Sequence, residues 1–220
     1  MNLPNVLTLL RIFFVPLLVA ALVQENLRFE WNGVTVTNQM LALAIFLAAA
    51  ATDLLDGYIA RRWGQITTVG TLLDPIADKL LVSAALISLV QVRLMPGWMA
   101  ILIIGREFAI SGLRSIAASA GYTIAASDLG KTKMVAQVIA ISLAMTSKDV
   151  PELAPMAHVA MWTVVFFSVL SAAMYFRKFW RKVDDRIKLR RRKELLADER
   201  RRRKEARLAG MAGARTTEVR

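Results

Sequence analysis

Four aspartates in the otherwise apolar stretch 53–78 constrain the fold of this chain more than any other feature. Asp53 and Asp56 are spaced i, i+3, and Asp74 and Asp78 are spaced i, i+4, so each pair shares one face of a helix. Charged groups in apolar surroundings are expensive and are by default functional. The stretch therefore predicts two helices that present carboxylates to a common site.

Residues 61–70, between the two pairs, are predicted to form a turn, since Gly64 and Gly70 weaken a helix there. The two helices would then be an antiparallel hairpin. At the helical rise, Asp53 and Asp78 would each lie roughly 12–14 Å from the turn. All four carboxylates are therefore expected at a similar depth, where they can converge.

Converging carboxylates in a low-dielectric pocket would repel one another and take up protons unless cations bind to them. Hard oxygen ligands favour Mg²⁺, Mn²⁺ or Ca²⁺, and four carboxylates can share two ions of the kind that clamp a transferring phosphoryl group. The residues alone leave two alternatives open. One is an ion-pair network with Arg61 or Lys79, and the other is the cation pathway of a channel or transporter.

The hydropathy of the chain predicts an all-α polytopic membrane protein. Of its 220 residues 56% are hydrophobic and 21% are charged, with a mean hydropathy of +0.46 and no cysteine to form disulfides or ligate metal. We expect six transmembrane helices at about 1–23, 39–62, 71–92, from Trp98 onwards, 131–146 and 154–176, with a polar loop over 24–38. Because Pro75 cannot donate a hydrogen bond to the carbonyl of Thr71, the third helix is expected either to start or to bend there. A signal peptide over the first of these is an alternative, disfavoured because no A-x-A-like cleavage site follows.

The net charge of +12 is concentrated at the C-terminus. Residues 1–176 contain 11 Lys and Arg against 10 Asp and Glu, whereas residues 177–220 contain 18 against 7. We expect a membrane domain over 1–180 and a basic tail over 181–220, partly helical or disordered, that contacts anionic lipids rather than nucleic acid. The positive-inside rule places both termini and the carboxylate hairpin on the cytoplasmic side.

A second polar group lies on the fourth predicted helix and at the start of the fifth. Arg106 and Arg114 are eight residues apart on nearly one helix face, and Lys131 and Lys133 begin the next helix. Four cations around one pocket predict a phosphate-binding site, with arginine supplying bidentate geometry. The alternative is that Glu107 pairs with one arginine and that the lysines only follow the positive-inside rule.

The spacing D-x2-D-G-x2-A-R-x8-G-x3-D-x3-D resembles the signature of the CDP-alcohol phosphatidyltransferases. Its specified positions are Asp53, Asp56, Gly57, Ala60, Arg61, Gly70, Asp74 and Asp78. The resemblance implies that the first three aspartates bind two metal ions, Mg²⁺ or Mn²⁺. It also implies that Asp78 is the general base, beside its place among the four candidate metal ligands.

The same resemblance implies where the CDP part of the donor would bind. On the first helix Asn5, Thr8 and Arg11 recur at i, i+3 and i+6, a stripe that is expected to face a polar cavity. They also resemble the N-x2-T-x2-R of the family's first helix, which lies near the donor diphosphate. The other implied CDP contacts are Gly57, Ala60, Arg61 and Gly70.

Three further segments resemble the bacterial branch of this family that uses glycerol 3-phosphate as acceptor. They are N-L-P-N-V-L-T-L-L-R, I-I-G-R-E-F-A-I-S-G-L-R and G-K-T-K, with Met134 as a departure where Thr is expected. The implied reaction transfers the phosphatidyl group of CDP-diacylglycerol to glycerol 3-phosphate at the inner (cytoplasmic) membrane, releasing CMP and phosphatidylglycerophosphate. Inositol phosphate, serine or phosphatidylglycerol as acceptor stays open, as does a homodimer. The lone His158 is predicted to be a packed or interfacial residue rather than a ligand.

Overall fold

The computed structural model describes residues 3–24, 28–31, 34–63, 68–121 and 129–217 of the chain. Side chains are described for 6–24, 28, 30, 35–52, 73, 75–121, 134–189, 191–192 and 194–196. The elements are α1 (Leu3–Val23), β1 (Arg28–Trp31), β2 (Val34–Thr37), α2 (Asn38–Trp63), α3 (Thr68–Gln91), α4 (Gly97–Ser119), α5 (Leu129–Thr146), the 3-10 helix η1 (Pro151–Leu153) and α6 (Ala154–Thr217). The prediction of a largely helical chain is therefore confirmed.

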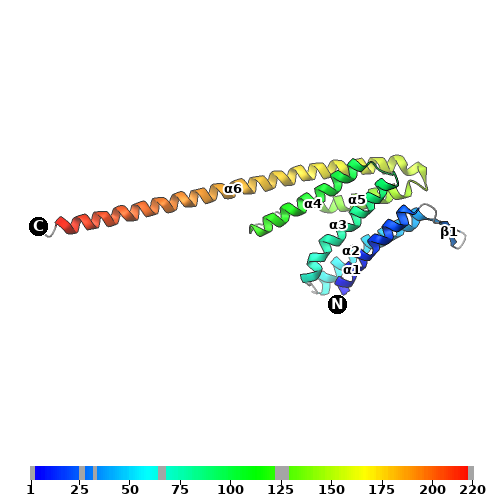
Figure 1. The fold of residues 1–220 in the computed structure, drawn as a ribbon, viewed down its shortest axis with the longest axis horizontal. Helices are drawn as coiled ribbons and strands as arrows, with labels where there is room; N and C mark the ends of the chain where they lie inside the picture. Colours follow the sequence, from blue (N-terminus) through cyan, green and yellow to red (C-terminus); the bar gives the residue numbers. More distant parts are fainter. Residues whose placement is uncertain (1–2, 25–27, 32–33, 64–67, 122–128, 218–220) are drawn as a thin grey trace. The chain divides into compact units, whose positions relative to one another are not determined.

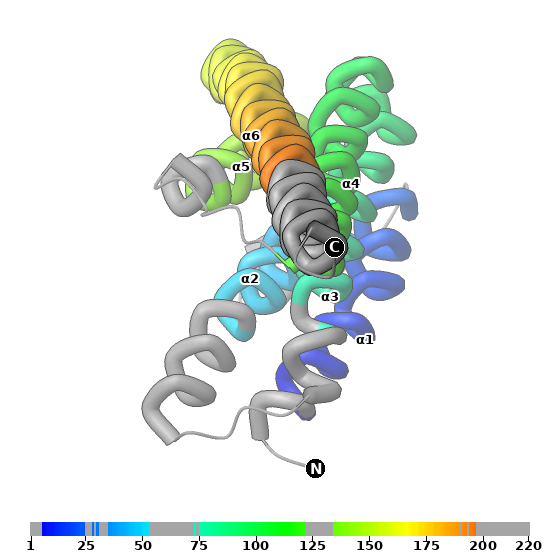
Figure 2. Tube along the Cα trace, turned by 90° about the vertical axis from the view of Figure 1, so that its left-hand side faces the viewer, coloured from blue at the N-terminus to red at the C-terminus, as the bar shows by residue number. Residues whose placement is uncertain are grey.

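The chain divides into two compact units, Met1–Ala173 and Met174–Arg220. In the first unit α1 packs along both α2 and α3, α5 packs against α2, and α4 packs against α3 (Figures 1 and 2). Because α1, α2 and α3 alternate in direction, α1 and α3 begin at the same end of the bundle. That end is also where the connection between α2 and α3 lies.

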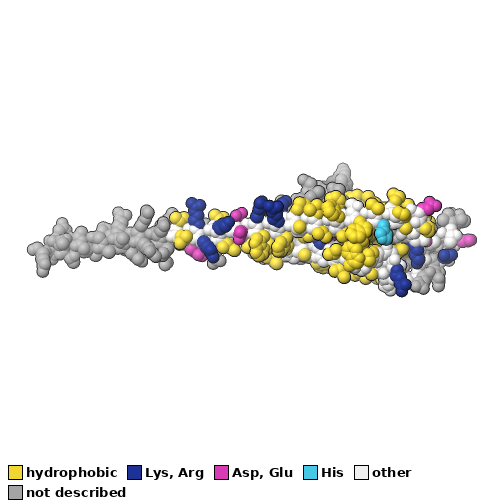
Figure 3. Space-filling view, turned by 90° about the horizontal axis from the view of Figure 1, so that it is seen from above, with side chains coloured by type: hydrophobic (Ala, Val, Ile, Leu, Met, Phe, Trp, Pro, Cys, Tyr) yellow, Lys and Arg dark blue, Asp and Glu magenta, His cyan; other side chains and the backbone are white. Residues whose placement is uncertain are grey.

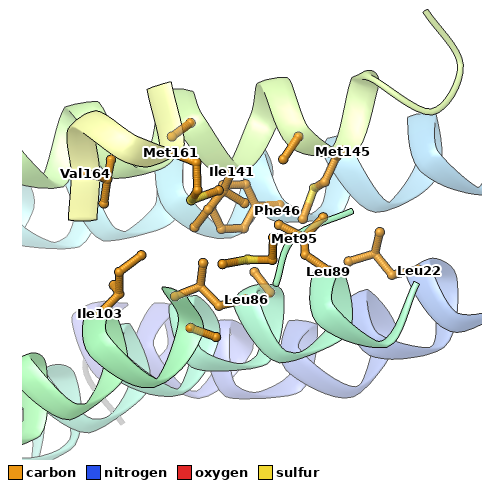
Figure 4. Packing of buried hydrophobic residues seen from close by; sticks show 14 of the residues in the cluster. Leu22, Phe46, Leu86, Leu89, Met95, Ile103, Ile141, Met145, Met161 and Val164 are labelled. Atoms are coloured by element: carbon orange, nitrogen blue, oxygen red, sulfur yellow. The ribbon is translucent and has the colours of Figure 1, made fainter. Parts of the chain in front are cut away.

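The core of the first unit draws side chains from all six long helices. Figure 4 shows Leu22 of α1, Phe46 of α2, Leu86 and Leu89 of α3, Ile103 of α4, Ile141 and Met145 of α5, and Met161 and Val164 of α6 packed together. Buried alanines such as Ala42, Ala85 and Ala140 lie among them and are fully inaccessible. Small residues let helix backbones approach closely. In a membrane the hydrophobic effect does not drive helices together, so their association depends on such close packing.

Two segments of the described chain are long and apolar enough to cross a membrane. They are Val6–Val23 and an apolar window within Pro151–Leu196, while Asn38–Thr52 and Met134–Thr146 are shorter apolar helices. Hydrophobic side chains also cover much of the visible surface of the first unit (Figure 3). The expectation of six spans with cytoplasmic termini stays a prediction.

The segment 24–38 differs from its prediction as a polar loop. Its strands β1 and β2 form an antiparallel hairpin in which Arg28 lies opposite Thr37 and Trp31 opposite Val34. The sequence explains the hairpin, because aromatic and β-branched residues alternate with polar ones on both sides of an Asn-Gly pair. Thr37 then caps α2 by accepting a 3.2 Å hydrogen bond from the Met40 amide, and its hydroxyl donates to Asp149.

The connection predicted over 61–70 is shorter in the structure. Helix α2 continues to Trp63 and α3 already begins at Thr68, seven residues before Pro75. Proline inside a helix costs the hydrogen bond to the carbonyl four residues earlier but leaves the preceding turn free to form. Helix α3 therefore does not start at Pro75, one of the two predicted outcomes. Helix α5 likewise begins two residues earlier than predicted, which puts Lys131 inside it.

The second unit is the continuation of α6, which runs unbroken to Thr217. Within it the rings of Phe176 and Trp180 stack with centroids 5.9 Å apart. Basic and acidic residues alternate along the remainder, a pattern typical of a solvated helix. Of the two states predicted for the tail, partly helical or disordered, the described residues are helical.

Candidate functional site

The backbones of α2 and α3 place the four aspartates at two matching levels. Asp53 lies ten residues before the end of α2 and Asp78 ten residues after the start of α3, about 15 Å along each helix. Asp56 and Asp74 lie seven and six residues from the same ends, or about 10 Å. The helix bounds therefore fit the predicted similar depth of the four positions, with one aspartate position from each helix at each level.

Of these four side chains the structure describes that of Asp78, which is half-buried. The side chains of Asp53, Asp56 and Asp74 lie outside the described set, as do those of the implied CDP contacts Asn5, Gly57, Ala60, Arg61 and Gly70. Among the side chains that are described, no cluster of three or more acidic or histidine groups could hold a metal. The predicted metal site thus falls on positions where only the backbone is known.

Helix α1 turns two residues of its polar stripe, Thr8 and Arg11, into the bundle, as the sequence predicted. Thr8 is 3% exposed and Arg11 is fully inaccessible, on a helix that is otherwise almost wholly apolar. Arg11 lies eight residues into α1, about 12 Å from its start. Because α1 packs along α2 and α3 and begins at the same end as α3, Arg11 lies at about the same level along the bundle as the backbone positions of the four aspartates. A buried cation needs anionic partners, which those helices carry.

Arg106, the first residue of the predicted phosphate-binding site on α4, contacts one residue of its own helix and one residue of α6. Arg106 Nη1 donates to Glu107 Oε1 at 2.6 Å, and Arg106 Nη2 donates to Ser171 Oγ on α6 at 2.6 Å. The ion pair with Glu107 is the alternative that the sequence left open. Ser171 was missed by the sequence reasoning, although Ser168 and Ser171 recur at i, i+3 in the apolar run of α6 and are a signal of an inward polar face.

Arg106 keeps one unused donor. Its side chain is 13% exposed, and the buried Nε has no hydrogen-bond partner in the described part of the chain. A buried unsatisfied donor is costly, so this atom points to a missing acceptor. Arg114 lies about 12 Å further along α4 and is exposed. The side chains of Lys131 and Lys133 lie outside the described residues, so convergence of the four cations stays a prediction.

Comparison with known proteins decides the family. A family model described as CDP-alcohol phosphatidyltransferase matches residues 1–170. The chain belongs to the CDP-alcohol phosphatidyltransferase family. It is therefore a phosphatidyltransferase, and the resemblance carried by residues 53–78 is confirmed.

A curated relative and two solved structures extend this result. The CDP-diacylglycerol–glycerol-3-phosphate 3-phosphatidyltransferase of Bacillus subtilis (strain 168) is 44% identical over 187 residues, covering 81% of this chain and 95% of the relative. The phosphatidylinositol phosphate synthase of Mycobacterium tuberculosis with CDP-DAG bound has a TM-score of 0.60 at 19% identity, covering 81% of this chain and 87% of that one. Its structure with manganese and citrate has a TM-score of 0.57 at 19% identity, covering 81% and 83%. These two likenesses support the fold.

Membership of a family of membrane-bound enzymes explains the apolar surface. Phe13, Ile101 and Val159 are 62%, 72% and 67% exposed, and many large hydrophobic side chains share this exposure. Contiguous apolar surface of this kind is a liability in water, whereas lipid solvates it. Thr8 and Arg11 on α1 face inward instead, and Arg106 links α4 to α6.

Proposed function

We propose that this enzyme transfers the phosphatidyl group of CDP-diacylglycerol to glycerol 3-phosphate, releasing CMP and phosphatidylglycerophosphate. The observation that carries the proposal is the two-level set of carboxylate positions on α2 and α3 beside the fully buried Arg11. The 44% identical relative, named for this reaction, supports glycerol 3-phosphate as the acceptor.

The carboxylate positions fit hard divalent cations, because two levels of paired oxygen ligands on facing helices suit two ions. We assign the metal ligands to Asp53, Asp56, Asp74 and Asp78, with Mg²⁺ or Mn²⁺ as the ion, and the manganese-bound structure of the family supports this choice. When bound, the ions neutralise the donor diphosphate and the charge that develops on CMP.

The half-buried Asp78 is assigned as the general base. Its carboxylate accepts the proton of the acceptor's primary hydroxyl as the hydroxyl oxygen attacks the phosphorus that bears diacylglycerol. The bond from that phosphorus to the CMP oxygen breaks and the electron pair leaves with CMP. The acceptor oxygen replaces CMP on the phosphorus in a single displacement, so no covalent enzyme intermediate is needed.

The donor is held from two sides in this proposal. On α1, Thr8 and Arg11 bind the diphosphate together with Asn5, since a buried guanidinium pairs strongly with phosphate. On the hairpin, the residues assigned to the CDP part are Gly57, Ala60, Arg61 and Gly70. Glycine and alanine at three of these positions leave room for the nucleotide to approach the helix backbone.

The acceptor's phosphate is assigned to the cations on α4 and α5. The unsatisfied Arg106 Nε supports this assignment, because a phosphate oxygen is an acceptor that would complete its hydrogen bonding. Arg114, Lys131 and Lys133 are assigned to the same phosphate. A neutral alcohol such as inositol would not need such a cluster of cations, whereas glycerol 3-phosphate would.

The proposed setting is the inner (cytoplasmic) membrane, with six spans, cytoplasmic termini and the site open to the cytoplasm. The support is the placement of basic residues near Arg61, around residues 119–133 and in the tail. A soluble acceptor and a nucleotide donor would both reach such a site. A homodimer is compatible with this setting and is tested by the mass of the purified complex.

An acceptor panel tests the proposal. Purified full-length protein with labelled CDP-diacylglycerol and divalent metal is expected to release CMP with glycerol 3-phosphate far faster than with inositol phosphate, serine or phosphatidylglycerol. Preference for another acceptor would refute the assigned substrate but keep the family reaction. Cation flux in liposomes with no CMP release from any acceptor would support the transporter alternative instead.

Replacing Arg106 by Ala is expected to raise KM for glycerol 3-phosphate about 10- to 150-fold, the equivalent of the 1.5–3 kcal/mol lost with a charged hydrogen bond. KM for CDP-diacylglycerol should change little. Initial rates with each substrate varied in turn measure both constants. Ser171→Ala is the matched control, since it removes the link from Arg106 to α6 and keeps the cation. An equal effect in Ser171→Ala would make Arg106 a structural tie instead of an acceptor ligand.

Truncation after Ile187 is expected to leave kcat within about twofold of the full chain, because the removed residues belong to the second unit and the assigned catalytic positions lie in the first. Binding to anionic vesicles should weaken, since about 1 kcal/mol is lost for each basic residue that contacts the lipid surface. Turnover in detergent and sedimentation with vesicles measure the two effects. Loss of turnover in a truncated protein that still unfolds cooperatively would place the tail in the active site.

A further inference from the structure

A cavity of about 220 Å³ lies at the end of the first unit where α3 passes to α4 and α5 passes to α6. Methionines Met95, Met99 and Met161 form part of its apolar wall, and Arg93, Ser147 and His158 supply its polar groups. The assigned chemistry uses none of these residues. Gln91, the last residue of α3, is thirteen residues beyond Asp78, or about 20 Å along the helix, so the cavity is separate from the carboxylate site.

Arg93 adopts a backbone conformation that favours glycine. Its φ of 61° is the one positive value at a non-glycine residue in the described chain. The Leu94 amide bonds the Leu89 carbonyl at 2.9 Å and the Arg93 amide bonds the Val90 carbonyl at 3.0 Å, the pattern of a Schellman motif that ends α3. An arginine kept where glycine would be unstrained points to a role for its side chain.

The polar groups of the cavity match a phosphate ester that also carries hydroxyls. Arg93 offers a bidentate cation for phosphate, and the His158 ring offers an N–H donor. The Ser147 hydroxyl already donates to the Ala144 carbonyl at 2.8 Å, so its oxygen remains available as an acceptor. A hydroxyl on the ligand can donate to that oxygen, whereas an ionised phosphodiester, which has no O–H, cannot.

The size and surroundings of the cavity favour a lipid headgroup. Its volume exceeds the roughly 150 Å³ that holds benzene in a protein core but falls below the roughly 300–1,000 Å³ of sites for whole drug-sized ligands. The side chains next to it in sequence are apolar and exposed, with Met156 at 59% and Val159 at 67%. Trp98 and Trp162 pack together with centroids 5.3 Å apart, and tryptophans of this kind are enriched at membrane interfaces.

We propose that this cavity binds the headgroup of an anionic glycerophospholipid, with Arg93 on the phosphate, Ser147 accepting from a headgroup hydroxyl, and the acyl chains lying along the exposed apolar surface outside. This site goes beyond the proposed transferase reaction. In the proposed orientation it faces the leaflet opposite the catalytic site. It would therefore hold a lipid that is neither donor nor product in the act of transfer.

The test measures lipid retained by the detergent-purified full chain. Dioleoylphosphatidylglycerol is titrated, bound lipids are counted by native mass spectrometry, and the midpoint of thermal unfolding is followed. Arg93→Gly suits the backbone of the turn, so it is expected to fold while losing about 10- to 100-fold in affinity for one lipid. Arg93→Lys should retain part of that affinity. Lys148→Ala removes an exposed charge at the same end that does not line the cavity, and should bind as the unchanged protein does.

Each arm of the experiment decides the inference. The inference is supported if Arg93→Gly loses one retained lipid but releases CMP at the normal rate, while Lys148→Ala retains the same lipids as the unchanged protein. Equal losses in Arg93→Gly and Lys148→Ala would reduce the effect to general surface charge, and no loss in Arg93→Gly would overturn the site. An equal rise of the unfolding midpoint with dioleoylphosphatidylcholine would refute a preference for anionic lipid. An equal rise with inorganic phosphate or glycerol 3-phosphate would refute a lipid as the ligand.

Discussion

Asp78→Asn is expected to lower the turnover number about 10²- to 10⁴-fold while KM for CDP-diacylglycerol stays nearly unchanged. The amide keeps the size of the side chain but cannot accept the proton of the attacking hydroxyl, and loss of a general base has this typical magnitude. Asp78 is half-buried in α3, ten residues from its start, so the substitution leaves a polar side chain of the same shape in the same place. CMP release under saturating substrates measures the effect.

Because Asp78 is also assigned as a metal ligand, the measurement is repeated over a range of Mg²⁺ concentrations. Turnover that recovers at high Mg²⁺ would assign Asp78 to the metal alone, whereas turnover that stays low would keep it as the base. Asp149→Asn is the matched control, since Asp149 is an acid of the same bundle that accepts from Thr37, far from the assigned site. Near-normal turnover in Asp78→Asn would remove it from both roles.

The helices of this protein could be predicted from sequence because their signals are long and local. The apolar runs of α2, α3 and α5 were placed to within three residues at each end. What failed was the description of short connections. The Gly-containing segment 61–70 was assigned to a turn, yet most of it extends α2 and α3, because helix propagation outweighs the modest cost of a single glycine or proline near an end.

The β hairpin shows a different kind of failure. Residues 28–37 carry charges and an Asn-Gly pair, which suggests a loop when only polarity is considered. The alternation of Phe29 and Trp31 with polar neighbours, and of Val34 and Val36 with threonines, has the period of two that predicts strands. Period and turn chemistry together would have given the hairpin from the sequence.

In the candidate site, too, some features could be predicted from the sequence and others could not. That the acids share helix faces follows from spacing, and the inward burial of Thr8 and Arg11 was likewise predicted from a repeat of three residues. The partners of Arg106 could not be predicted, because its contact with Ser171 joins residues 65 positions apart through the packing of α4 against α6. Spacing along one helix specifies a face, while contacts between helices require the tertiary structure.

Removal of divalent cations is expected to bring CMP release to background, with recovery on adding Mg²⁺ or Mn²⁺. Four carboxylates at the assigned positions on α2 and α3 would repel one another and the donor diphosphate when no cation is bound. Chelation should therefore also lower the midpoint of thermal unfolding. A ligand at 100 times its Kd stabilises the folded state by about 2.7 kcal/mol.

Asp56→Asn is expected to raise the metal concentration for half-maximal CMP release by at least about 10- to 100-fold, the range seen when residues that merely support metal ligands are lost. The asparagine keeps one oxygen ligand but removes the charge that attracts the ion. Metal titrations of CMP release and of the unfolding midpoint should shift together, because both report occupancy of the same ions. Glu30→Gln, an exposed acid on β1, is the matched control and should shift neither. Full activity in excess chelator, or an Asp56→Asn variant with an unchanged metal requirement in both titrations, would show that these carboxylates serve an ion-pair network instead of a metal site.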